Sequence, residues 1–81
     1  MYKNKTEDGR NNLCGPKIKE YRLKHKQRLS QKGLADLLVL EGLDVDKNAV
    51  QRIEAGKRFV TDIELKVIAR VLNVSCDELL D

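Results

Sequence analysis

The sequence predicts an all-α fold, a compact domain of five helices, and three observations support that prediction. Apolar residues recur at helical spacing in successive short segments. Four of these segments follow a serine, threonine or aspartate that suits a helix cap. The chain has 81 residues, of which 41% are apolar, and no tryptophan. Its core must therefore come mainly from aliphatic side chains of packed helices, and so short a chain has little room for an enzyme-sized cleft.

Residues 1–14 are predicted to form a flexible N-terminal arm, and residues 15–81 to form the folded domain. The arm is polar, mixed in charge and without apolar periodicity, which is typical of a disordered leader. Two interpretations remain open. The segment is either a plain tail or an arm whose Lys3, Lys5 and Arg10 follow a nucleic-acid groove or backbone.

The first two helices have clear start or stop signals. Gly15 and Pro16 open the first helix, because proline suits the first helical position, where its missing N–H costs nothing. Ser30 is expected to cap the second helix, and Gly42 to end it. Gly33, in the first turn, costs roughly 0.5 to 1 kcal/mol relative to alanine. The residues expected to face inward are Ile18, Tyr21, Leu23, Leu34, Leu37, Leu38 and either Val39 or Leu40.

The last three helices are also marked by caps. Asp46 is the expected cap of a third helix from Lys47 to Ala55, and Gly56 is its expected left-handed terminator. Two capping boxes follow, one from Thr61 to Glu64 and one from Ser75 to Glu78. The inward-facing residues expected here are Val50, Ile53, Ile63, Leu65, Val67, Ile68, Val71, Leu72, Val74, Leu79 and Leu80. A dimer seam is the alternative interpretation of the last three.

The second and third predicted helices, joined by a turn that contains glycine, form a helix-turn-helix signature between Ser30 and Gly56. The third helix would offer to solvent a row of long donors suited to base edges and phosphates in a DNA major groove: Lys47, Asn48, Gln51 and Arg52. Upstream, the segment from Lys17 to Lys32 carries seven basic residues and one acid, Glu20. Such a run is most often a solvated helix face, but beside this signature it favours nucleic-acid binding.

Four motifs in order resemble the lambda-repressor-like, or Cro-type, helix-turn-helix regulators of the XRE family. They are I-x-x-Y-R from Ile18, L-S-Q-x-x-L-A from Leu29, V-x-x-I-E-x-G-K-R from Val50 and A-x-x-L-x-V-x-x-x-E-L-L from Ala69. The resemblance covers Ile18 to Leu80. It implies a regulator of transcription, a repressor, that binds specific sites on double-stranded DNA as a homodimer on a palindrome.

The resemblance also implies roles for individual residues. The third helix would contact bases through Lys47, Asn48, Gln51 and Arg52. Phosphate contacts would come from Gln31, Lys32, Lys57 and Arg58. Arg22 and Glu54 would form an ion pair that ties the first helix to the third. We expect this pair to orient the helices more than to stabilise them, because desolvation offsets much of the Coulomb gain.

The chain departs from the family pattern in the spacing around its turn. Seven positions separate Ala35 from Gly42 and four separate Gly42 from Asp46, where the usual gaps are four and two. The second helix is therefore predicted to be nearly one turn longer, and the turn after it longer too. About two extra residues lie around His25 to Arg28, between the first and second helices.

No catalytic or cofactor-binding constellation is visible in the sequence. His25 is the single histidine, and no nucleophile and carboxylate are arranged around it. Cys14 and Cys76 lie far apart, without metal-ligand spacing, so free thiols are expected. Cys76 is expected to be a half-buried packing thiol, with a redox sensor as the alternative. The sequence thus predicts a protein that is not an enzyme and that needs no cofactor or metal.

A second class of function remains open, because the same fold also serves in antitoxins and other protein-interaction modules. The apolar run from Leu37 to Leu40, on the lengthened second helix, favours that alternative. The sequence has no apolar stretch near 18 residues and no signal-peptide core, so it predicts a cytoplasmic protein.

Overall fold

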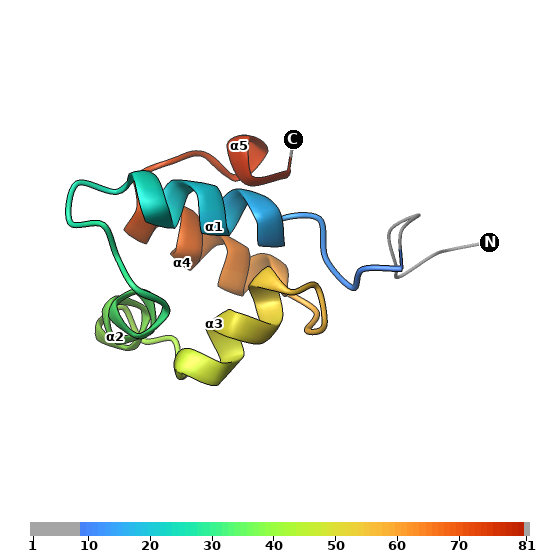
Figure 1. Ribbon diagram of the computed structural model, residues 1–81, viewed down its shortest axis with the longest axis horizontal. Helices are drawn as coiled ribbons and strands as arrows, with labels where there is room; N and C mark the ends of the chain where they lie inside the picture. Colours follow the sequence, from blue (N-terminus) through green and yellow to red (C-terminus); the bar gives the residue numbers. More distant parts are fainter. Residues whose placement is uncertain (1–8, 81) are drawn as a thin grey trace.

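The computed structural model describes residues 9–80, which form five α-helices and, within that range, no β-strand (Figure 1). The predicted all-α architecture of five helices is confirmed. The helices are α1 (Gly15–Lys24), α2 (Gln31–Leu40), α3 (Lys47–Glu54), α4 (Asp62–Leu72) and α5 (Cys76–Leu80).

The predicted caps define where most of these helices begin. The Ser30 side chain accepts a hydrogen bond from the backbone N–H of Gly33 at 2.9 Å, at the start of α2. Asp46 caps α3 in the same way. Both bonds of the Thr61 capping box are present at the start of α4, and the reciprocal pair between Ser75 and Glu78 is present at the start of α5. These caps supply partners for backbone N–H groups that have none inside the helix.

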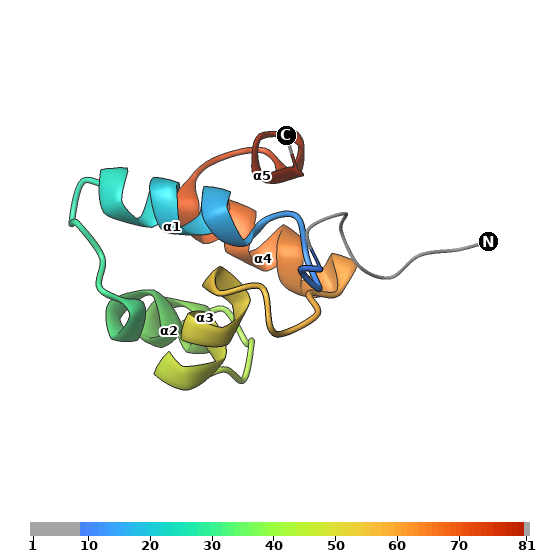
Figure 2. The same cartoon turned by 45° about the vertical axis from the view of Figure 1, so that its right-hand side comes forward.

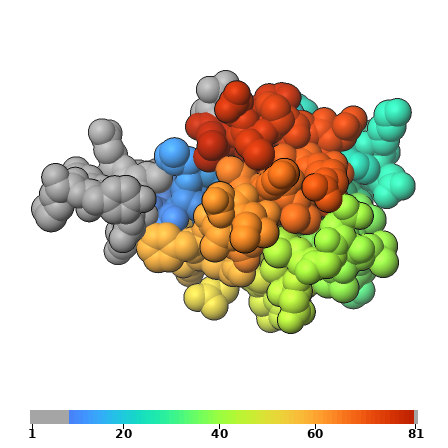
Figure 3. Space-filling model, turned by 180° about the vertical axis from the view of Figure 1, so that it is seen from behind, coloured from blue at the N-terminus to red at the C-terminus, as the bar shows by residue number. Residues whose placement is uncertain are grey.

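The five helices surround one aliphatic core. Figures 1 and 2 show α1 and α4 side by side, with α5 on one side of this pair and α2 and α3 together on the other. From behind, α4 lies between α2 and α5 (Figure 3). The side chains buried most completely come from all five helices: Ile18, Leu34, Leu38, Val50, Ile68 and Leu79. This packing leaves one long face of α3 open to solvent.

Several apolar residues that the sequence placed inward are exposed instead. Leu40 is 79% exposed and Ile63 is 71% exposed; the others are Leu23, Val39 and Leu80. The reason is helical geometry, since each residue advances by about 100° around the axis. Ile63 lies five positions before the buried Ile68, about 140° away, and Leu40 lies about 200° from the buried Leu38. Short helices bury one stripe, and these side chains lie outside it.

The chain before α1 also differs from the prediction. The flexible arm was expected to extend to residue 14, but residues 10–12 are hydrogen-bonded to the end of α3 and the loop after it, and Cys14 is only 2% exposed in the core. Burial raises the pKa of the Cys14 thiol. Both cysteines are free thiols, as predicted, and Cys76 is half-buried. Lys3 and Lys5 lie outside the described residues.

Candidate nucleic-acid interface

The open face of α3 presents the four polar residues that the sequence assigned to base contacts. Lys47, Asn48, Gln51 and Arg52 are all exposed, while Val50 and Ile53 turn into the core on the opposite side. None of the four side chains has a hydrogen bond or an ion pair with any residue between 9 and 80. An open hollow of about 400 Å³ lies along this face, lined by Asn48, Gln51, Arg52, Ala55 and Lys57. The face therefore keeps its donors available to a partner.

The C-terminal end of α3 is held by a buried ion pair between Arg22 of α1 and Glu54. Arg22 Nε donates to Glu54 Oε2 at 2.7 Å, and Nη2 donates to Oε1 at 3.0 Å. The side chains are 8% and 4% exposed. The third guanidinium nitrogen, Nη1, donates to the carbonyl of Leu29 at 2.9 Å. The pair expected from the sequence is thus present in a two-bond geometry, which fixes the direction of α3 relative to α1.

Two residues at the start of α2, both assigned to phosphate contacts, have partners inside the protein. Gln31 Nε2 donates to Glu54 Oε1 at 3.1 Å, so its amide joins the buried network. Lys32 pairs with Asp36 at 3.2 Å on the exposed face of α2. An exposed pair of this kind contributes little and opens easily. The phosphate contacts of both residues stay predictions.

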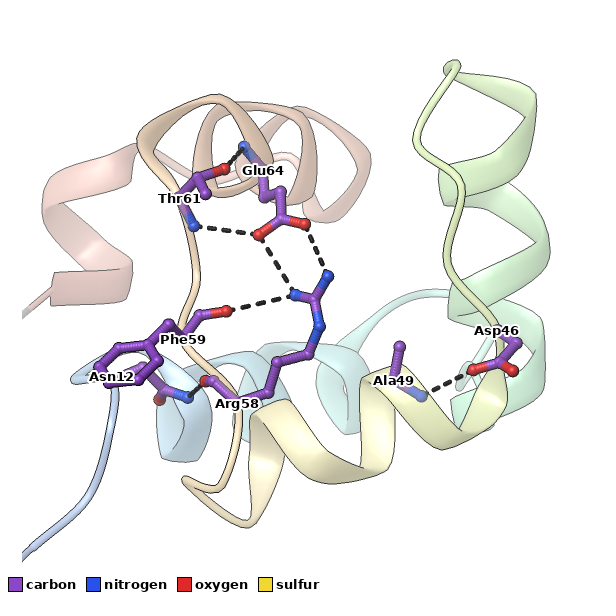
Figure 4. A network of polar contacts seen from close by, with 7 residues as sticks. All are labelled: Asn12, Asp46, Ala49, Arg58, Phe59, Thr61 and Glu64. Carbon is purple, nitrogen blue, oxygen red and sulfur yellow. Dashed lines mark hydrogen bonds and ion pairs between the residues drawn. The ribbon is translucent and has the colours of Figure 1, made fainter.

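Lys57 and Arg58, in the loop after α3, have different surroundings. The Lys57 side chain is exposed and makes no polar contact with another residue in the described part of the chain. Arg58 makes two parallel bonds to Glu64, at 2.8 and 3.2 Å, and a third to the carbonyl of Phe59 (Figure 4). The hydrogen bond from Arg58 lowers the pKa of the Glu64 carboxyl. A phosphate would have to compete with Glu64 for Arg58, and that contact stays a prediction.

The polar segment before α1 contacts this site through residues 10–12, of which the sequence analysis named only Arg10, as part of an arm along a nucleic-acid groove or backbone. Residues 10–12 donate to carbonyl oxygens at the end of α3 and in the loop after it. The bonds run from Arg10 Nη2 to Glu54 (2.7 Å), from Asn11 N to Gly56 (2.8 Å), from Asn11 Nδ2 to Lys57 (3.1 Å), and from Asn12 Nδ2 to Ile53 (3.0 Å) and Arg58 (2.7 Å). One of these residues had a local signal in the sequence: Asn12 lies three residues before Gly15, where an asparagine oxygen can accept from the first N–H of α1. The long-range pairing has no such signal.

Gly56 explains how the segment comes so close to the end of α3. Its φ of +79° is the left-handed conformation that the sequence predicts for the helix terminator. A Cβ at this position would lie 2.6 Å from Cζ of Arg10, so with any other residue here the arginine side chain would have to shift. The same residue therefore ends the helix and admits the N-terminal segment.

α2 and the turn after it form a separate surface. Val45 is buried and anchors the turn, while Leu40 at the end of α2 is exposed. A hollow of about 270 Å³ lies between α2 and α4, lined by Leu37, Leu40, Glu41, Arg70 and Val71. Glu41 and Arg70 form an exposed ion pair at its edge, 3.5 Å apart. This surface is distinct from the open face of α3.

The described residues were also compared with the requirements of a metal site and of a membrane-spanning helix. Residues 9–80 contain no group of three or more histidine, cysteine, aspartate or glutamate side chains arranged to hold a metal ion. No helix in the same range is both long and apolar enough to cross a membrane.

Comparison with known proteins agrees with this geometry. The profile of the family described as "Helix-turn-helix" matches residues 18–79. The crystal structure of the restriction-modification controller protein C.AhdI from Aeromonas hydrophila is similar, with a TM-score of 0.67 and 32% sequence identity over 82% of this chain and 86% of that one. The P22 c2 repressor protein, solved in complex with synthetic operator 9T, shares the fold, with a TM-score of 0.69 and 23% identity over 86% of this chain and 96% of that one.

A search of curated protein sequences gave no significant match. The family match spans most of the chain and includes both helices of the motif and the loop that follows it. The chain therefore belongs to the helix-turn-helix family of lambda-repressor-like transcriptional regulators.

Proposed function

We propose that the chain is a repressor that binds specific sequences of double-stranded DNA, with α3 in the major groove. The observation that carries the proposal is the open face of α3, where four polar side chains have no partner among residues 9–80. Asn48 and Gln51 have the amide geometry that pairs with adenine, and Arg52 and Lys47 have the donors that pair with guanine. These four residues would choose the site.

Contacts to the DNA backbone would supply most of the affinity. Gln31 lies in the first turn of α2, where free backbone N–H groups favour a phosphate. Lys57 is available beside α3, and Lys32 and Arg58 would exchange a carboxylate partner for a phosphate. Each neutralised phosphate releases counterions, so the logarithm of the affinity should fall against the logarithm of salt with a slope of about −0.9 per contact.

We extend the proposal to a homodimer on a palindromic site in the cytoplasm. A single α3 reads only a few base pairs, and helix-turn-helix regulators gain affinity by placing two such helices about one DNA turn apart. The P22 c2 repressor, whose fold the chain shares, is described in complex with an operator. The spacing of half-sites in a selected sequence would report the dimer geometry.

The experiment is selection of binding sites from a randomised duplex pool at roughly physiological salt, where non-specific binding is weak. The chain should enrich a palindrome, and the fourfold variant K47A/N48A/Q51A/R52A should not. A control variant, Lys66→Ala, removes a cation from an exposed position on α4 and should still enrich it. Enrichment by the fourfold variant would refute the assignment of base reading to α3.

The alternative, a protein-interaction module of the same fold, is supported by the exposed Leu40 and the hollow between α2 and α4. The same selection separates the two functions. If the unmodified chain enriches no sequence and binds DNA only weakly, with strong dependence on salt, DNA reading is rejected in favour of that alternative.

A further inference from the structure

The carbonyl oxygens at the end of α3 have an uncommon set of partners. The last four carbonyls of a helix have no partner inside the helix, and most are satisfied by water or by the chain that follows. Here Glu54 O accepts from Arg10 at 2.7 Å. Ile53 O accepts both from the backbone N–H of Gly56, in the chain that follows, and from Asn12. Arg10 and Asn12 precede α1 and lie 41 to 44 positions from their acceptors. Residues of the segment before α1 therefore help to cap the C-terminal end of α3.

Asn12 is a buried member of this cap. It is 9% exposed, and its amide makes three hydrogen bonds. Oδ1 accepts from the backbone N–H of Gly15 at 2.8 Å, while Nδ2 donates to Ile53 O at 3.0 Å and to Arg58 O at 2.7 Å (Figure 4 shows the last of these). One side chain thus joins the start of α1, the end of α3 and the loop after α3.

The close packing around Gly15 supports a specific contact between the start of α1 and the end of α3. A Cβ at Gly15 would lie 2.5 Å from the Ile53 carbonyl oxygen and 2.9 Å from Asn12 Oδ1, closer than real Cβ atoms approach. Glycine at the start of α1 therefore lets the two helix ends meet with Asn12 between them. Both amide hydrogens and the amide oxygen of Asn12 are used where water is largely excluded.

We propose that Asn12 is a positioning residue for DNA reading, which sets the pose of α3 and of the Lys57–Arg58 loop through main-chain carbonyls. The inference rests on the proposed function. Because α3 has only eight residues, a tilt at its C-terminal end moves Gln51 and Arg52 relative to a base edge. Hydrogen bonds to bases depend steeply on distance and angle, so such a tilt lowers the affinity for the specific site more than the affinity for other DNA.

The variant Asn12→Asp tests this role because it keeps the hydrogen-bond acceptor of the side chain and removes the donor. A carboxylate still accepts from the N–H of Gly15 and suits the start of α1, but it cannot donate to Ile53 O or Arg58 O. Asn73→Asp is the matched control, since it makes the same chemical change at an exposed position after α4. Asn12→Ser, which also keeps an acceptor and lacks the reach of the amide, is the second variant should the first not fold.

The measurement is the ratio of dissociation constants for a random duplex and for the duplex that the unmodified chain selects, at a temperature where circular dichroism shows every variant folded. For Asn12→Asp we expect the specific affinity to fall roughly tenfold, the effect of losing one good base contact. Affinity for random DNA should fall by a smaller factor, because phosphate contacts carry no sequence information and depend less on the exact pose of α3. Amide chemical shifts across α3 should move in Asn12→Asp and stay in place in Asn73→Asp.

Two negative outcomes are distinguishable. If the unmodified chain selects no duplex, the proposed function fails and the role of Asn12 fails with it. If the chain selects a duplex and Asn12→Asp, or Asn12→Ser, lowers only the free energy of unfolding and leaves the ratio unchanged, then Asn12 is merely structural and this inference alone is overturned.

Discussion

The outer face of α3 and its C-terminal end differ in how the rest of the molecule uses them. On the outer face, four polar side chains lie in solvent without a partner among residues 9–80. At the C-terminal end, the Glu54 carboxylate and successive carbonyls are bonded to α1, to α2 and to the segment before α1. The two parts of this eight-residue helix therefore have different roles. Contacts at the C-terminal end fix the direction of α3, and its outer face stays free to bind a partner.

The largest expected effect comes from breaking the fixed end. Arg22→Met should lower the free energy of unfolding by about 3–5 kcal/mol, because the Glu54 carboxylate stays buried without its counter-charge. Urea unfolding followed by circular dichroism measures the change. Lys19→Met, at an exposed position on the same helix, is the control and should stay within about 0.5 kcal/mol of the unmodified chain. A loss below about 1 kcal/mol for Arg22→Met would show that the pair does not hold the helix end.

An intermediate effect is expected from substitutions on and beside the open face of α3. They should change the affinity for DNA and not the stability of the fold. Gln51→Ala should weaken binding to the selected duplex by about 1–3 kcal/mol, the value of one good base contact, and leave the unfolding free energy nearly unchanged. Lys57→Ala should instead weaken binding to all duplexes alike and reduce the salt slope by about 0.9. Fluorescence anisotropy titrations at several salt concentrations measure both. Equal losses on specific and random DNA for Gln51→Ala would remove it from the base-reading set.

The smallest expected effect is on stability and concerns Arg58, which lies between the two regions and is bound by Glu64. Glu64→Gln keeps a side chain that can complete the Thr61 capping box but removes the charge that binds Arg58. The ion pair is partly exposed, so the expected loss of unfolding free energy at pH 7 is about 1 kcal/mol or less.

The effect of this variant should depend on pH. The folded pKa of Glu64 is lowered by Arg58, so the stabilisation is complete above the pKa of the unfolded chain and is lost as the pH falls through the folded pKa. The difference between Glu64→Gln and the unmodified chain should therefore shrink in acid, as urea unfolding at stepwise lower pH would show. Glu41→Gln, in the exposed pair with Arg70, is the control. A difference that stays constant down to about pH 3 would contradict the assignment of the shift to this pair.

Local features of the fold could be predicted because their signals are local. A side-chain oxygen at Ser30, Asp46 or Thr61 and the N–H groups it serves lie within three residues, so the spacing alone reveals the cap. The left-handed end of α3 is equally local, because only the residue type at position 56 decides it. The pairing of Arg22 with Glu54 came from the family resemblance, since no local rule links positions 32 residues apart.

The features that escaped prediction depend on which face of a short helix meets the core, or on contacts across the chain. Ile63 and Leu40 continue an apolar pattern yet lie outside the buried stripe of their helices. The bond from Arg58 to Glu64, in the first turn of α4, was not predicted, while the phosphate contact of Arg58 stays a prediction. Asn12 reads as part of a polar tail until the carbonyls of Ile53 and Arg58 are placed beside it.

The way residues before α1 bind the end of α3 has a consequence for how such a protein can change its target. Asn11 and Asn12 contact main-chain oxygens of α3 and its loop, groups that every amino acid supplies. Substitutions at the outer positions of α3 therefore leave this attachment chemically intact. New DNA preferences can therefore arise by changing the outer side chains of α3 one at a time. The residues that hold the end of the helix do not have to change with them.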